Sequence, residues 1–92
     1  MSTFRLEIIT PERKYPAYDV RGLDVPAERG RLTVLVRHEP FVCWLKPGPI
    51  KVNTGDGSLH VWPGGPGVMT VTKEGVTLLL QAIDMSAETA PA

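Results

Sequence analysis

The sequence has little of what most enzymes and membrane-spanning proteins require. It contains one cysteine and two histidines, so it offers no internal disulfide and few ligands for a zinc ion. No apolar run of about 18 residues or more is present, which argues against a membrane-spanning helix. Ten basic and ten acidic side chains cancel without forming a block of one sign. Strong attraction to nucleic acid or to an anionic membrane is therefore not expected.

The first residues also lack the apolar stretch of a secretory signal. Together with the lone cysteine, this favours a protein of the reducing cytoplasm that packing alone stabilises. What the sequence does contain is regular punctuation: nine glycines and nine prolines lie between short apolar stretches. Such spacing is typical of many short strands joined by turns.

Alternation between apolar and polar side chains identifies the strands near the N-terminus. Residues 4–9 place Phe4, Leu6 and Ile8 on one face of a strand. Residues 18–25 are also strand-like, but the parity of their apolar positions changes at Gly22. A β-bulge at Gly22 would return the apolar side chains on both sides of it to one face.

Later segments carry turn signals between apolar runs. Residues 41–45 are apolar on both parities, which predicts a strand covered on both sides. Residues 53–57 predict a hairpin, because their Gly and Asn or Asp positions accept a positive φ, and a last hairpin is expected around Lys73-Glu74-Gly75. Residues 46–49 must turn, and residues 63–67, rich in Pro and Gly, are expected to form no regular structure.

These segments predict an all-β protein, a small antiparallel sandwich of about ten short strands. Residues 1–84 are expected to form this one domain. Residues 85–92 are small and polar, and we expect them to be a short disordered tail.

Candidate catalytic or cofactor-binding residues are scarce. Cys43 lies within an apolar strand, where a thiol usually serves as packing. No Gly-x-Ser-x-Gly turn occurs, and the glycines of residues 63–67 precede no helix that could bind phosphate. The sequence therefore predicts no catalytic residue, no metal site and no cofactor.

Two rival functions stay open at this stage. A cupin-like metal enzyme would use His38 and His60 with a carboxylate. A free-standing sandwich that binds carbohydrate or peptide would use Trp44 or Trp62 as its contact platform, provided that both are exposed and clustered.

The loop Glu28-Arg29-Gly30-Arg31 is the most promising polar feature. It places two guanidinium groups beside one carboxylate, and arginine is well suited to protein contacts because its fork is planar and weakly hydrated. An ordinary solvated turn is the alternative interpretation.

Several segments, taken in order, resemble the N-terminal domain of the ATP synthase epsilon subunit. The resemblance runs from about residue 4 to residue 83, and its order and spacing are more specific than any one motif. The segments that carry it are Leu6-Glu7-Ile8-Ile9-Thr10-Pro11, Gly30-Arg31-Leu32, His38-Glu39-Pro40-Phe41, Leu45-Lys46-Pro47-Gly48 and Val76-Thr77-Leu78-Leu79-Leu80. Pro66-Gly67 departs from the Gly-Gly that the family usually has there.

This resemblance implies a non-catalytic central-stalk subunit of a rotary F-type ATP synthase, which links the gamma subunit to the ring of c subunits and couples ion transport to ATP synthesis or hydrolysis. Membrane association at the cytoplasmic face of the bacterial inner membrane would come only through the complex. By position, the ring-facing residues are Glu28, Arg29, Gly30 and Arg31, and the gamma-facing residues are Thr10, His38 and Val42. Nucleotide binding is not expected, because the C-terminal helices that provide it in some family members do not follow in this sequence.

Overall fold

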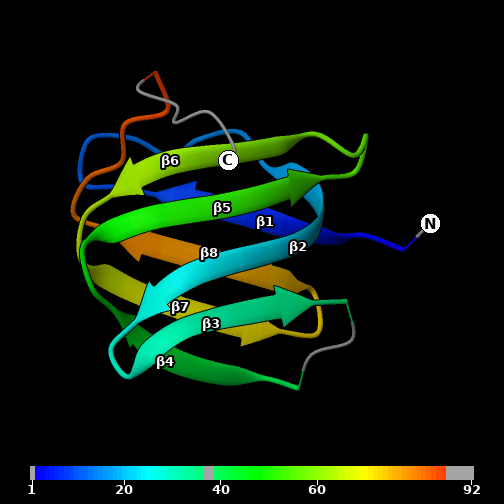
Figure 1. Cartoon of the computed structure of the whole chain (residues 1–92), viewed down its shortest axis with the longest axis horizontal. Coiled ribbons are helices and arrows are strands. Elements are labelled where there is room, and N and C mark those ends of the chain that lie inside the picture. The colour runs from blue at the N-terminus through cyan, green and yellow to red at the C-terminus, as the bar shows by residue number, and fades with distance from the viewer. Residues whose placement is uncertain (1, 37–38, 87–92) are drawn as a thin grey trace.

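The computed structural model describes residues 2–36 and 39–86 of the chain. The strands of this part are β1 (Phe4–Ile9), β2 (Tyr18–Ala27), β3 (Gly30–Leu35), β4 (Phe41–Leu45), β5 (Gly48–Thr54), β6 (Leu59–Gly64), β7 (Gly67–Thr72) and β8 (Gly75–Leu80). They form two layers, one of β1, β8, β7 and β4 and the other of β3, β2, β5 and β6 (Figure 1). In the described part of the chain, no helix is long and apolar enough to cross a membrane. The predicted all-β sandwich is confirmed.

Strand β2 connects the two layers. Its first residues pair with β1, its middle pairs with β5 and β3, and Ala27 at its end pairs with Leu45 of β4. Strands β1 and β8 are parallel, with Leu6 opposite Val76, whereas the other pairs are antiparallel. The antiparallel sandwich that the sequence predicts thus contains one parallel pair. A parallel pair needs a long connection between its strands, and here the rest of the sandwich provides it.

The core lies between the layers and is apolar. The residues at most 1% exposed are Leu6, Ile8, Val20, Leu23, Val25, Val34, Ile50, Val52, Met69 and Leu78. Burying each of their side chains contributes roughly 1.5–3 kcal/mol. The pairing of β2 with β5 shifts register between Val20 and Gly22. This confirms the β-bulge, and it explains how Val20 and Leu23 both reach the core despite their opposite parity.

The described residues form eight strands, fewer than the ten expected. Tyr18–Ala27 is one continuous strand through the bulge. Two further segments form isolated β-bridges, between Ile9 and Lys14 and between Gly64 and Ile83. A single bridge is not counted as a strand, so the described residues form eight strands and not about ten.

The expectation that residues 63–67 lack regular structure is wrong at both ends. Strand β6 continues through Pro63 and Gly64, and β7 begins at Gly67. Pro63 is tolerated because β6 lies at the end of the strand order, where a missing N–H leaves no ladder bond unmade. Its carbonyl accepts a hydrogen bond from the Asp84 amide at 3.0 Å.

The chain beyond β8 stays close to the sandwich as far as it is described. The hydroxyl of Tyr18 donates to the sulfur of Met85 across 3.7 Å, and Met85 packs against the core. Residues 87–92 lie outside the described residues. The predicted boundary between a domain of residues 1–84 and a tail of residues 85–92 therefore stays a prediction.

Gly75→Ala should destabilise the fold strongly. Gly75 has φ +145°, and a Cβ there would collide with the backbone of Arg5 in the parallel neighbour β1. We expect the free energy of unfolding to fall by roughly 2 kcal/mol or more. Gly30→Ala is the matched control, since Gly30 also has a positive φ but open space around it. Equal losses for the two variants in urea denaturation would show that the collision is absent.

Candidate interaction surfaces

Strand β4 exposes one of its two apolar sides. Phe41 and Cys43 pack against the core and Leu45 belongs to it. Val42 and Trp44 point the opposite way and are each 67% exposed. The prediction that this strand is covered on both sides is therefore wrong for the chain alone. The described part of the chain covers one side, and the other side faces solvent.

The exposed side of β4 continues as an apolar row across its layer. Trp44 lies opposite Val68, Val68 opposite Leu79, and Leu79 opposite Ile9. Leu79 is 45% exposed. We name Ile9, Val42, Trp44, Val68 and Leu79 the apolar face. The next row places threonines between Val42 and β1, so this face carries no charge in its middle.

Two of the gamma-facing residues predicted from the sequence lie at opposite edges of this layer. Val42 belongs to the apolar face on β4, and Thr10 directly follows Ile9 at the end of β1. The Thr10 amide donates to the carbonyl of Arg13 at 2.8 Å, which closes the turn after β1. His38, the third predicted residue, lies outside the described residues.

Sequence reasoning missed Val68, Leu79 and Ile9 as surface residues. The signal that could have found Leu79 was present, because residues 78–80 are three consecutive leucines and a strand buries only alternate positions on one side. The same reasoning applies to residues 41–45. Apolar side chains on both parities of a strand in a two-layered protein indicate that something must cover the outer side.

The turn between β2 and β3 forms a second surface, at one end of the sandwich (Figure 1). Glu28, Arg29 and Gly30 are exposed, and Gly30 has φ +132°. Among the described residues, the side chains of Glu28 and Arg29 make no ion pair. The Glu28 amide donates to the carbonyl of Trp44 at 3.0 Å, so the turn is attached to β4. A groove of about 450 Å³ lies beside this attachment; it is lined by Ala27, Glu28, Arg29, Gly30, Arg31, Leu32, Cys43 and Trp44.

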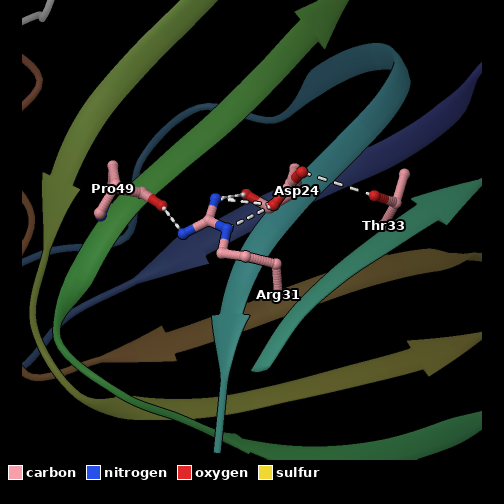
Figure 2. A network of polar contacts seen from close by, with 4 residues as sticks. All are labelled: Asp24, Arg31, Thr33 and Pro49. Carbon is pink, nitrogen blue, oxygen red and sulfur yellow. Dashed lines mark hydrogen bonds and ion pairs between the residues drawn. The ribbon is translucent and has the colours of Figure 1, made fainter. Parts of the chain in front are cut away.

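Arg31 differs from Arg29, although both belong to the predicted ring-facing loop. Figure 2 shows its guanidinium group between Asp24 of β2 and Pro49 of β5. Its Nε donates to Oδ1 of Asp24 at 2.8 Å, and its Nη1 donates to the carbonyl of Pro49 at 2.8 Å. The Arg31 fork is therefore engaged by its own chain, whereas Arg29 faces solvent.

The residues considered for the rival functions are not arranged for them. Trp62 is 4% exposed and belongs to the core, so it cannot form an exposed platform with Trp44. His60 stacks on the ring of Trp62 with 5.4 Å between centroids. The described residues contain no group of three or more His, Cys, Asp or Glu side chains that could hold a metal ion. Burial raises the pKa of the Cys43 thiol, as expected for a packing residue.

Asp56, in the hairpin turn between β5 and β6, has a pKa lowered to about 2. The first cause is the Thr54 hydroxyl, which donates to Oδ1 of Asp56 at 2.5 Å. The Ser58 amide donates to the same oxygen at 2.9 Å. Both donors belong to the turn itself, and Gly57 completes it with φ +89°. The lowered pKa thus reflects a local turn.

The fold and its surfaces define a class of protein: a small all-β sandwich with an exposed apolar face and an exposed charged turn. Residues 3–85 match the family "ATP synthase, Delta/Epsilon chain, beta-sandwich domain". The chain belongs to this family, which confirms the resemblance seen in the sequence.

Individual relatives agree with this assignment. The ATP synthase epsilon chain of Natranaerobius thermophilus is 38% identical over 86 residues, covering 92% of this chain and 61% of the relative. That of Bradyrhizobium sp. (strain ORS 278) is 34% identical over 79 residues, covering 86% of this chain and 58% of the relative. The chain thus spans about three fifths of the length of these relatives.

Solved structures share the fold at lower identity. A chain of the Euglena gracilis mitochondrial ATP synthase (OSCP/F1/c-ring) matches 91% of this chain with a TM-score of 0.84 and 19% identity, and the match covers 54% of that chain. A chain of the Tetrahymena thermophila mitochondrial ATP synthase (central stalk/c-ring) matches 90% with a TM-score of 0.76 and 14% identity, covering 66% of that chain. At these identities the likeness concerns the fold.

Asp56→Asn should destabilise the fold in a pH-dependent way. The folded pKa of about 2 lies below the unfolded value of about 3.9. Ionised Asp56 therefore stabilises the fold above about pH 4, and this contribution disappears as the pH falls through about 2. The stability gap between parent and variant should be largest near neutral pH and close by about pH 2. Thr54→Val removes the hydroxyl that contributes most to the lowered pKa of Asp56. It should therefore reduce the pH-dependent part of the stability that Asp56 provides. A gap that is constant with pH would contradict this.

Proposed function

We propose that this chain is a non-catalytic central-stalk subunit of a rotary F-type ATP synthase. It links the gamma subunit to the ring of c subunits and couples ion transport to ATP synthesis or hydrolysis. It acts at the cytoplasmic face of the bacterial inner membrane, where the complex holds it, without a catalytic residue or a bound nucleotide of its own. Family membership over residues 3–85 supports this role. The single observation that carries it is the solvent-facing apolar side of β4 and its neighbours.

The apolar face supports a protein partner on that side of the sandwich. Val42 and Trp44 would be costly to leave in water together with Leu79, and contiguous exposed apolar side chains usually mark a protein interface. Tryptophan is one of the residue types that most often dominate the binding energy of protein interfaces. We assign the gamma subunit to this face, because it includes Val42 and ends beside Thr10. His38 remains part of the proposed gamma contact by its position in the sequence.

The β2–β3 turn supports a second partner at a different place. The turn of Glu28, Arg29 and Gly30 is exposed at one end of the sandwich (Figure 1), whereas the apolar face lies on strands β1, β8, β7 and β4 of one layer. We assign the exposed part of the turn, Glu28, Arg29 and Gly30, to the c ring, with Arg31 at its base. Two contact sites on different sides suit a connector, which must bind both neighbours at the same time.

The fold provides the stiffness that a connector in a rotating stalk needs. Strand β2 pairs with strands of both layers, and a close-packed apolar core fills the space between them. Close-packed interiors have low compressibility and transmit strain. A force applied at the turn therefore reaches the apolar face without deforming the domain between them.

Trp44→Asp should weaken binding to a purified gamma subunit. The substitution places a carboxylate within the apolar face and removes a large side chain, so we expect at least a roughly 30-fold loss in affinity. Asn53→Asp is the matched control, because it adds the same charge at an exposed strand position of the other layer. Calorimetric titration measures both. Equal affinities for Trp44→Asp, Asn53→Asp and the parent would exclude the apolar face as the gamma site.

Arg29→Glu should weaken attachment of the gamma-bound chain to isolated c rings. An exposed charge at an interface acts mainly on the association rate, so we expect an effect of about 3- to 10-fold at low salt that shrinks as salt is added. Lys73→Glu reverses a charge in the β7–β8 turn at the opposite end of the sandwich (Figure 1) and should have no effect. If both variants bind rings like the parent, the turn is not the ring contact.

A further inference from the structure

We propose that Arg31 is a positioning residue, which holds the β2–β3 turn in its binding conformation and does not itself contact the ring. Because the proposed function places this turn against the c ring, the inference rests on that function. The proposal divides the charged residues of this loop, which look alike in the sequence, into two kinds with different roles. Only Glu28 and Arg29 offer their charges to a partner.

The guanidinium of Arg31 uses most of its donors within the chain. Besides the bonds from Nε and Nη1, its Nη2 lies 2.7 Å from Oδ1 of Asp24 and donates to the Asp24 carbonyl at 3.2 Å. Asp24 is held in turn by Thr33 of β3, whose hydroxyl donates to Oδ2 at 3.5 Å (Figure 2). An arginine whose fork is filled in this way has few N–H groups left for a second protein.

This network ties together the strands at the base of the turn. Asp24 belongs to β2, Thr33 and Arg31 to β3, and Pro49 to β5. Arg31 itself lies opposite Pro26 in the last pairs of the β2–β3 ladder before the turn. The residues beyond it, Glu28 and Arg29, have no side-chain anchor of their own among the described residues. The brace at Arg31 therefore sets the direction in which the turn leaves the sandwich.

The exposure of the network favours a role in geometry over one in global stability. The side chains of Arg31 and Asp24 are 39% and 32% exposed, and ion pairs in contact with water contribute little to folding. A constraint of this kind matters more for binding, because a turn already held in its bound conformation loses less freedom on association.

The chemistry of the site requires arginine. One planar group must reach a carboxylate on β2 and a carbonyl on β5 at once, and its nitrogens point in these directions. A lysine ammonium is a compact point charge on a flexible stem and cannot reproduce the fork. Arg31→Lys therefore keeps the charge of the loop but not the brace.

Ring binding of the gamma-bound chain separates positioning from contact. We expect Arg31→Met, Arg31→Lys and Asp24→Asn each to weaken ring binding by about 3- to 10-fold. The double variant Asp24→Asn with Arg31→Met should be no weaker than the weaker single variant, because both substitutions break the same brace. If Arg31 contacted the ring directly, Asp24→Asn would release its fork and leave binding unchanged or tighter, and Arg31→Lys would retain most of the affinity. Either result overturns the proposal.

Amide hydrogen exchange in the free chain provides a readout that does not depend on any partner. The Glu28 amide, which donates to Trp44, should exchange faster in Arg31→Met and Asp24→Asn through local opening, and at the parental rate in Arg29→Met. Val76→Ala, a core substitution near the start of β8, controls for lost global stability, and it should leave the exchange rate of the Glu28 amide unchanged. Unchanged exchange in the brace variants overturns the positioning role, whatever the chain binds. If the Glu28 amide exchanges faster in the brace variants but Arg29→Glu does not affect ring binding, the positioning role of Arg31 is supported. In that case the turn is not the contact with the c ring.

Discussion

Strand β2 pairs along both of its edges and changes partners on each edge within ten residues. One edge meets β1 and then β3, and the other meets β5 and then β4. On the first edge the change falls at the bulge between Val20 and Gly22, where a Cβ on Gly22 would lie 3.3 Å from the side chain of Leu35. Without the bulge, Leu23 and Val25 would point away from the core that Val20 enters. The two layers and the common core between them depend on this irregularity.

The division of the surface follows from that construction. Since the inner sides of both layers are filled by one core, further apolar side chains lie on the outer sides, where the described part of the chain leaves them exposed to solvent. Trp44 and Leu79 are such side chains. The turn at the end of β2 leaves the sandwich where its strand passes from one layer to the other, beside the groove next to β4. The strand that closes the domain therefore also carries the proposed ring contact.

Local patterns were sufficient to predict most of the strands, the hairpin turns at Gly57 and Gly75 and the bulge at Gly22, because each depends on neighbours along the chain. They failed where Pro and Gly predicted turns or irregular structure, since residues 48–49 extend β5 and residues 63–64 extend β6. The parallel pairing of β1 with β8 left no local signal, since nothing in either strand specifies its direction relative to a strand some seventy residues away. The hydrogen bonds of Arg31 could not be predicted from local patterns either. They depend on Asp24, seven residues earlier, and on Pro49, which only the fold brings near.

The prediction for residues 41–45 was wrong for the isolated chain in an informative way. The pattern indicated that both sides of the strand avoid water, and packing within the chain satisfies only one of them. Apolar side chains are kept where they are buried in the cell, whether by the chain's own core or by a partner. A strand that is apolar on both parities is therefore expected to be covered on both sides in its working environment. In β4, the sequence predicts that both sides are covered, whereas the fold covers only one. The uncovered apolar side identifies the apolar face, without reference to any relative.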